Sequence, residues 1–145
     1  MKRTQQIELT NMCIIKDGND ILVMDKTDSE FENSITFPGG HVEQNESIQA
    51  SVIREIKEET GIDIVEPQLK GIVNFNLDNQ IKEFIFVYEA ECNSNVSKAT
   101  IKQTYEGKTY WINKAQIKSL QLNKVIEAVY DTWLKGEVKE LYFEN

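Results

Sequence analysis

The segment from Gly40 to Ile62 constrains the fold of this chain more than any other stretch of its sequence. Residues Ser47 to Thr60 contain neither glycine nor proline and predict a helix of about four turns. Gly61 is expected to end that helix, because a glycine readily adopts the left-handed conformation found just beyond a helix C-terminus. Apolar side chains at every fourth position predict the stripe that faces the core: Ile48, Val52 and Ile56.

Three carboxylates share an adjacent face of the predicted helix. Glu55, Glu58 and Glu59 are spaced at i, i+3 and i+4, which brings their side chains together on one side. Such a cluster repels itself in an ordinary solvated helix. Hard divalent cations such as Mg²⁺ take oxygen ligands and turn the repulsion into coordination. The spacing therefore predicts a metal site on this helix.

The residues before the helix, Phe37 to Glu43, predict a tight loop with two adjacent glycines, Gly39 and Gly40. Without a Cβ, this backbone is free to approach a metal or a phosphate closely. Glu46 precedes Arg54 by eight residues. We expect it to reach Arg54 from the loop and to form an ion pair that holds the loop against the helix.

The complete register, residues 40–62, resembles the Nudix box, G-x5-E-x7-R-E-U-x-E-E-x-G-U with U aliphatic, at every fixed position. The chain is thus identified as a member of the Nudix (MutT-type) hydrolase superfamily, whose members cleave nucleoside diphosphates linked to another moiety. The resemblance implies an α/β/α sandwich with a mixed β-sheet between helices. It also implies that Glu55, Glu58 and Glu59 bind the catalytic Mg²⁺ or Mn²⁺. Gly39 or Gly40 would supply a backbone carbonyl ligand, and Glu46 with Arg54 would form a structural pair.

The general base is less sharply defined by the sequence. Glu106 precedes Trp111 in the stretch YEGKTYW, which resembles the E-x-x-x-x-W context that supplies the base in several relatives. A carboxylate there would orient or deprotonate the attacking water. Glu43 and Glu83 are the alternatives.

Composition and net charge indicate how many domains the chain forms, where it is located and which partners it can bind. At 145 residues, with 40% hydrophobic and 28% charged residues, the chain is expected to form one Nudix domain over residues 1–145. It shows no signal peptide or membrane-length apolar run, and Cys13 and Cys92 lie in apolar stretches like reduced core thiols, so we expect a cytoplasmic protein.

The net charge of −8 and the lack of a basic cluster argue against duplex nucleic acid and membranes as partners. A small nucleotide remains acceptable where Mg²⁺ reverses the local sign of charge. A monomer and a homodimer both remain open.

The remaining elements follow from the hydrophobic periodicity and the turn residues. Expected strands are Glu8–Lys16, Asp20–Asp25, Leu69–Leu77, Ile81–Cys92 and Thr109–Ile112, and Ser34–Phe37 is expected to be a short extended segment that enters the glycine loop. Two further helices are expected at Lys114–Ser119 and Asn123–Lys135.

The substrate class is predicted from residues outside the box. Relatives that act on ADP-ribose, diadenosine polyphosphates, coenzyme A or NADH carry extra signatures outside the box. This chain has no proline about fifteen residues after Gly61 and no S-Q-P-W-P-F motif. Residues Leu69 to Phe75 resemble the strand after the box in bacterial 8-oxo-dGTP and nucleoside triphosphate diphosphatases. We therefore expect a Mg²⁺-dependent pyrophosphohydrolase that cleaves a nucleoside triphosphate, such as the oxidised purine 8-oxo-dGTP, to the monophosphate and pyrophosphate. The alternatives are hydrolysis of a nucleotide sugar, a dinucleotide or a capped RNA, and a sensor that binds a nucleotide without turnover.

Overall fold

In this computed structural model of the protein, the residues described are 3–26, 35–78, 81–92 and 108–144. Its strands are β1 (Gln6–Asp17), β2 (Asp20–Asp25), β3 (Ile35–Thr36), β4 (Gly39–His41), β5 (Gln68–Asn76), β6 (Ile81–Glu91), β7 (Lys108–Asn113) and β8 (Lys139–Glu144). The helices are α1 (Ile48–Thr60), the 3₁₀ helix η2 (Lys114–Ser119) and α2 (Lys124–Leu134). No helix within the described ranges combines the length and the apolar character that crossing a bilayer requires.

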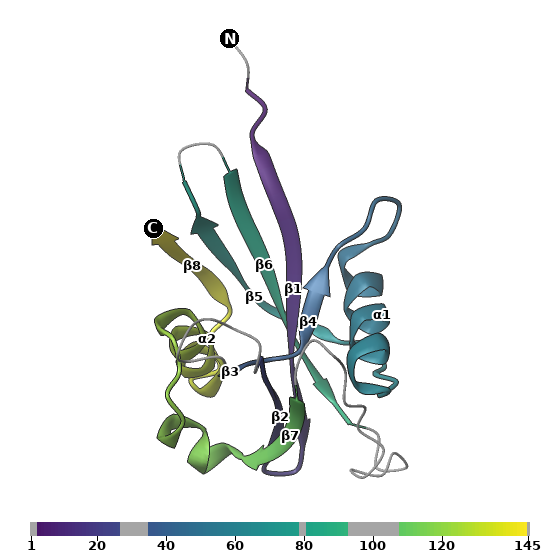
Figure 1. Cartoon of the computed structure of the whole chain (residues 1–145), viewed down its shortest axis with the longest axis vertical. Coiled ribbons are helices and arrows are strands. Elements are labelled where there is room, and N and C mark those ends of the chain that lie inside the picture. The colour runs from purple at the N-terminus through teal and green to yellow at the C-terminus, as the bar shows by residue number, and fades with distance from the viewer. Residues whose placement is uncertain (1–2, 27–34, 79–80, 93–107, 145) are drawn as a thin grey trace.

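The strands form one mixed sheet in the order β3-β2-β1-β6-β5-β8, with β4 added to β1 and β7 added to β2. β1 runs parallel to β6, and β5 runs antiparallel to β6 and parallel to β8. Helices α1 and α2 lie on opposite sides of this sheet (Figure 1). The expected α/β/α sandwich around a mixed sheet is therefore confirmed.

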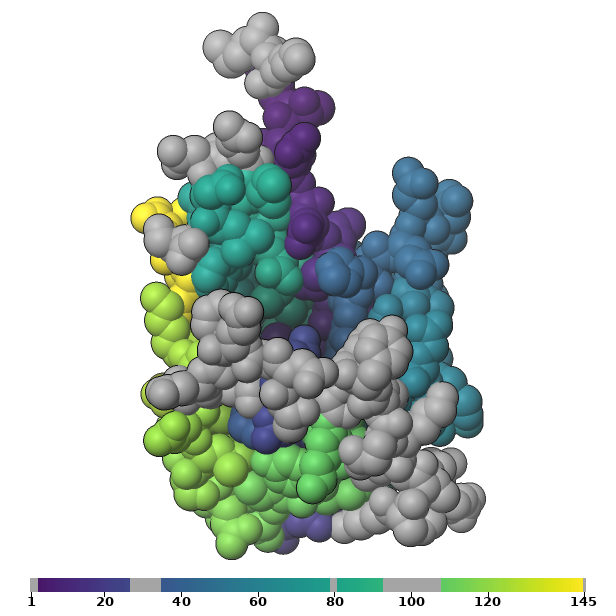
Figure 2. Space-filling view, viewed as in Figure 1, coloured from purple at the N-terminus to yellow at the C-terminus, as the bar shows by residue number. Residues whose placement is uncertain are grey.

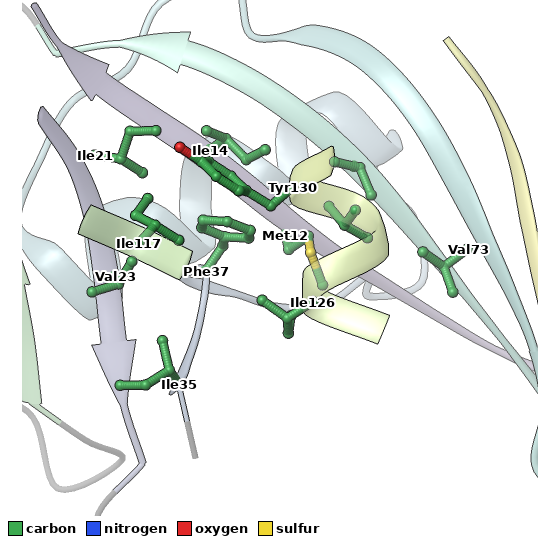
Figure 3. Close-up of a cluster of buried hydrophobic side chains, with 12 residues drawn as sticks. Met12, Ile14, Ile21, Val23, Ile35, Phe37, Val73, Ile117, Ile126 and Tyr130 are labelled. Atoms are coloured by element: carbon green, nitrogen blue, oxygen red, sulfur yellow. The ribbon is translucent and has the colours of Figure 1, made fainter. Parts of the chain in front are cut away.

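Alternation along β1 divides the core into two layers, because successive side chains of a strand point to opposite faces. Met12 and Ile14 join the cluster under α2, whereas Cys13 and Ile15 join the cluster under α1. The α2 layer centres on Tyr130, which is fully buried (Figure 3). The Tyr130 hydroxyl donates to the Lys114 carbonyl at 2.7 Å, so its one polar atom is satisfied.

Helix α1 begins and ends as its sequence predicts. Ser47 is the N-cap and accepts a hydrogen bond from the Ala50 amide at 3.0 Å. Gly61 adopts the left-handed conformation at φ 80°, and its amide donates to the Lys57 carbonyl. Of the expected stripe, Val52 and Ile56 are completely buried, and Ile48 is partly buried against them.

Two parts of the chain differ from the expectation. Lys139–Glu144, which the sequence pattern did not predict as a strand, forms the edge strand β8 beside β5. Gly39–His41 is not a tight loop but the short strand β4, antiparallel to Thr10–Met12 of β1. The reason is that extended glycines pair with β1 at close range, and neither Gly39 nor Gly40 has a positive φ.

Candidate active site

A single line of α1 faces the glycine strand. Ser51, Glu55 and Glu59 recur every four residues, next to the core stripe of Val52 and Ile56. Ser51 is fully buried and Glu59 is 4% exposed. The Glu55 side chain is 17% exposed. Low exposure of carboxylates along one helical line is unusual, so this line is the candidate functional face of α1.

Both glycines of β4 lie in close contact with other parts of the site. A Cβ on Gly40 would stand 2.3 Å from the Glu55 carboxylate oxygen Oε2. A Cβ on Gly39 would stand 2.1 Å from the Asn11 carbonyl oxygen. Any side chain at either position would collide, so the two glycines allow the β4 backbone to lie between β1 and the Glu55 carboxylate.

Arg54 connects the segment before α1 to the helix itself. Its Nη2 and Nε donate to the two carboxylate oxygens of Glu46 at 2.7 and 3.1 Å, a bidentate ion pair. Nη2 also donates to the His41 carbonyl at 2.9 Å, and Nη1 donates to Glu55 at 2.9 Å and to Glu58 at 3.4 Å. One guanidinium thus holds β4, the following loop and two of the box glutamates.

The ion pair between Arg54 and Glu46 shifts the pKa of both groups. Hydrogen bonds from Arg54, aided by the Glu43 amide, lower the pKa of Glu46 below its ordinary value of 4.5. The same hydrogen bonds, with the contact to Glu55, raise the pKa of Arg54 further above its ordinary range. Both groups are therefore ionised at neutral pH.

The three box glutamates differ in environment. Glu55 lies beside Gly40, Glu59 is buried, and the Glu58 side chain is 60% exposed and turned toward Arg54. Within the described residues, no three acidic, histidine or cysteine side chains surround a common point. The structure therefore brings Glu55, Gly40 and Arg54 into contact, and it leaves Glu58 at the rim.

A cleft of about 200 Å³ opens in front of β4. Its polar lining residues include Thr10, Lys26, Glu59 and Glu83, and its apolar ones include Met12, Met24, Phe37 and Ile85. The cleft forms where β1 changes partner, from β2 at Lys16 and Asp17 to β4 at Thr10 to Met12. Figure 2 shows β1 in purple on this face, between β6 in teal and the blue segment that leads into α1.

A larger cleft of about 430 Å³ lies elsewhere, lined by residues that include Asp63, Glu66 and Glu89, and it touches none of the box glutamates. We place the site in the smaller cleft, because that cleft reaches Gly40 and Glu59.

The three candidate bases fall in different places. Glu83 lines the cleft with Glu59, and its Oε2 accepts a hydrogen bond from the Thr10 hydroxyl at 2.8 Å. The Glu43 side chain is 69% exposed and lies 3.8 Å from Arg54. Glu106 lies outside the described residues.

Sequence reasoning missed two polar residues of this site. Asn11 and Ser51 are 4% and 0% exposed, and their side chains join β1 to α1. The sequence feature that could have revealed Asn11 is the polar pair Thr10-Asn11, which directly precedes the apolar run MCII. Buried polar residues in such a run require partners.

Gly40, Glu55 and Glu59 form one wall of the candidate site, and the oxygen atoms of this wall suit Mg²⁺ or Mn²⁺. Glu55 and Glu59 offer carboxylate oxygens, and the glycine strand offers backbone carbonyls that no side chain obstructs. All of these are hard oxygen ligands of the kind that such cations take. The fit rests on the close approach of Gly40 to the Glu55 carboxylate and on the low exposure of Glu55 and Glu59.

Comparison with known proteins agrees with the geometry. Residues 8–133 match the model of the NUDIX domain. Over 131 residues the chain is 33% identical to the uncharacterised Nudix hydrolase YvcI of Bacillus subtilis, which covers 86% of this chain and 78% of that protein. A 60-residue stretch, 41% of this chain and 34% of the relative, is 43% identical to an ADP-ribose pyrophosphatase of Methanocaldococcus jannaschii. The crystal structure of a MutT protein from Bacillus halodurans superposes with a TM-score of 0.75 at 28% identity, covering 93% of this chain and 86% of that one.

Proposed function

The chain belongs to the Nudix family of hydrolases, which act on pyrophosphate bonds of small nucleotides, and from this premise we propose that it is a Mg²⁺-dependent nucleoside triphosphate pyrophosphohydrolase. It would release a nucleoside monophosphate and pyrophosphate, and 8-oxo-dGTP is one candidate substrate. The observation that carries the proposal is the wall formed by Gly40, Glu55 and Glu59 beside an open cleft.

Each residue of the wall has a role in this proposal. Glu55 and Glu59 hold the cation, with Glu58 at the rim and a carbonyl of Gly39 or Gly40 as a further ligand. When bound, Mg²⁺ neutralises charge on the phosphates and lowers the pKa of the attacking water. Arg54 keeps the Glu55 carboxylate and the β4 backbone in place through its hydrogen bonds to Glu55 and to His41.

The cleft itself supports a nucleotide substrate. Lys26 supplies a positive charge for phosphates, and Phe37 and Ile85 supply apolar surface for a base. The similar structures include a MutT protein, and the similar sequences include an ADP-ribose pyrophosphatase, so a nucleoside diphosphate derivative is the second candidate substrate. The complete set of box glutamates favours turnover over a silent sensor.

The test is release of pyrophosphate or phosphate from a substrate panel at millimolar Mg²⁺. The panel would contain canonical and oxidised nucleoside triphosphates, ADP-ribose, a nucleotide sugar and a dinucleotide. We expect the largest kcat/KM for a nucleoside triphosphate, with pyrophosphate as the product. If the protein prefers ADP-ribose, the second substrate class is favoured instead. If it hydrolyses none of the compounds, the proposal is overturned.

For the general base we propose Glu106, with Glu83 and Glu43 as the alternatives. Replacing the base by glutamine is expected to lower kcat with little change in metal affinity, because it removes a proton acceptor and leaves the ligands intact. Glu106→Gln, Glu83→Gln and Glu43→Gln would be compared by kcat and by Mn²⁺ calorimetry. If Glu106→Gln retains wild-type kcat while Glu83→Gln does not, the base is Glu83.

A further inference from the structure

Asn11 is the polar exception in an otherwise apolar row of β1. The residues that follow it on the same face of the strand, Cys13 and Ile15, are fully buried in the layer under α1. Asn11 is itself 4% exposed, so its amide has lost almost all of its water. A buried amide is tolerated when its polar atoms find partners, and the partners of Asn11 define what it connects.

Those partners belong to the two elements that make up the proposed metal site. The Asn11 Nδ2 donates to the Ser51 hydroxyl of α1 at 2.9 Å. The Gly40 amide of β4 donates to the Asn11 Oδ1 at 3.1 Å. The Ser51 hydroxyl in turn donates to the Ile48 carbonyl at 2.6 Å, which fixes its orientation. One side chain thus joins α1 to the glycine strand.

The link reaches both sides of the contact between Gly40 and Glu55. Ser51 lies one helical turn before Glu55 and two turns before Glu59, on the same line of α1. Gly40 packs against the Glu55 carboxylate so closely that a Cβ would stand 2.3 Å from it. At that separation, a small shift of β4 relative to α1 changes the distance between the glycine carbonyls and the Glu55 and Glu59 carboxylates.

From these contacts we infer that Asn11 is a positioning residue, which sets the distance between β4 and the glutamates of α1 and thereby tunes the affinity for the divalent cation. The inference rests on the proposed function of this wall. Asn11 itself donates no ligand atom. Outer partners that orient ligands commonly change metal affinity by about 10–100-fold when they are replaced.

The test compares two variants with a matched control. Asn11→Leu keeps the volume and removes both hydrogen bonds. Ser51→Ala keeps the Gly40 contact and removes the link to α1. The control is Ile126→Ala, which opens a cavity in the layer under α2, on the opposite side of the sheet from α1 and its glutamates. Mn²⁺ affinity would be measured by calorimetry, and the melting temperature would be recorded without metal.

We expect Asn11→Leu to weaken Mn²⁺ binding by about tenfold or more, and Ser51→Ala to weaken it in the same direction. Ile126→Ala should lower the melting temperature while it leaves Mn²⁺ affinity unchanged. A kcat of Asn11→Leu that recovers at high Mn²⁺ concentration would further support positioning, because a purely structural loss does not respond to metal.

Different failures have different meanings. If the wild type binds Mn²⁺ and both variants bind it equally well, Asn11 only stabilises the fold and the inference is overturned. If Asn11→Leu does not fold, the affinity of Ser51→Ala decides in the same way. If the wild type binds no Mn²⁺, the proposed function fails, and the inference fails with it.

Discussion

Glu55→Gln is expected to lower turnover by about 10³-fold or more. The substitution keeps the shape of the side chain and an oxygen that accepts from Arg54. It removes the negative charge that would hold the cation next to Gly40. The fold should survive, because Glu55 contributes little apolar packing and glutamine is as good a helix former as glutamate.

The measurement is kcat with pyrophosphate detection, together with Mn²⁺ affinity by calorimetry. Glu127→Gln is the matched control, since it makes the same chemical change on an exposed position of α2. The control should retain wild-type kcat. Near wild-type turnover in Glu55→Gln at the same metal concentration would rule out the assigned role of the carboxylate.

Arg54→Ala is expected to lower the free energy of unfolding by about 2 kcal/mol. The Arg54 side chain is 25% exposed, so solvent screens part of its interaction with Glu46. The substitution also removes the donor to the His41 carbonyl, which leaves β4 and the loop before α1 less firmly held. Chemical denaturation at neutral pH measures the loss. Lys57→Ala, on the same helix as Arg54, is the control, because the ion pair of Lys57 with Asp63 is exposed and contributes little.

The loss from Arg54→Ala should depend on pH. Because the pKa of Glu46 is lowered in the folded protein, the pair stabilises the fold fully above the ordinary value of 4.5. Its contribution disappears as the pH falls through the lower folded value, where Glu46 becomes protonated. The difference between wild type and variant should therefore shrink in acid. An Arg54→Ala protein that is fully stable but inactive would instead identify Arg54 as a substrate ligand.

The local sequence determined much of α1 and of the site around it. The cap at Ser47, the left-handed Gly61 and the register of Val52 and Ile56 all depend on neighbouring residues, so spacing alone predicted them. The approach of Glu46 to Arg54 was predictable for the same reason, since both residues lie within three turns of the helix start.

Long-range contacts were not predictable in this way. The conformation of Gly39 and Gly40 depends on pairing with β1, which lies almost thirty residues earlier, as the contact between Asn11 and Gly40 shows. The edge strand β8 depends on pairing with β5, and its short segment KELYFE carries no strong strand pattern. The outward turn of Glu58 toward Arg54 depends on side-chain competition that helical periodicity does not describe.

The most direct test of the site is an anomalous difference map from crystals grown with Mn²⁺. We expect a peak at the wall formed by Gly40, Glu55 and Glu59, whose oxygen atoms would be the ligands. The peak should disappear in Glu55→Gln crystals grown under the same conditions. A Mn²⁺ peak confined to another part of the molecule, or none at all under conditions that support hydrolysis, would contradict the assignment of this wall as the metal site.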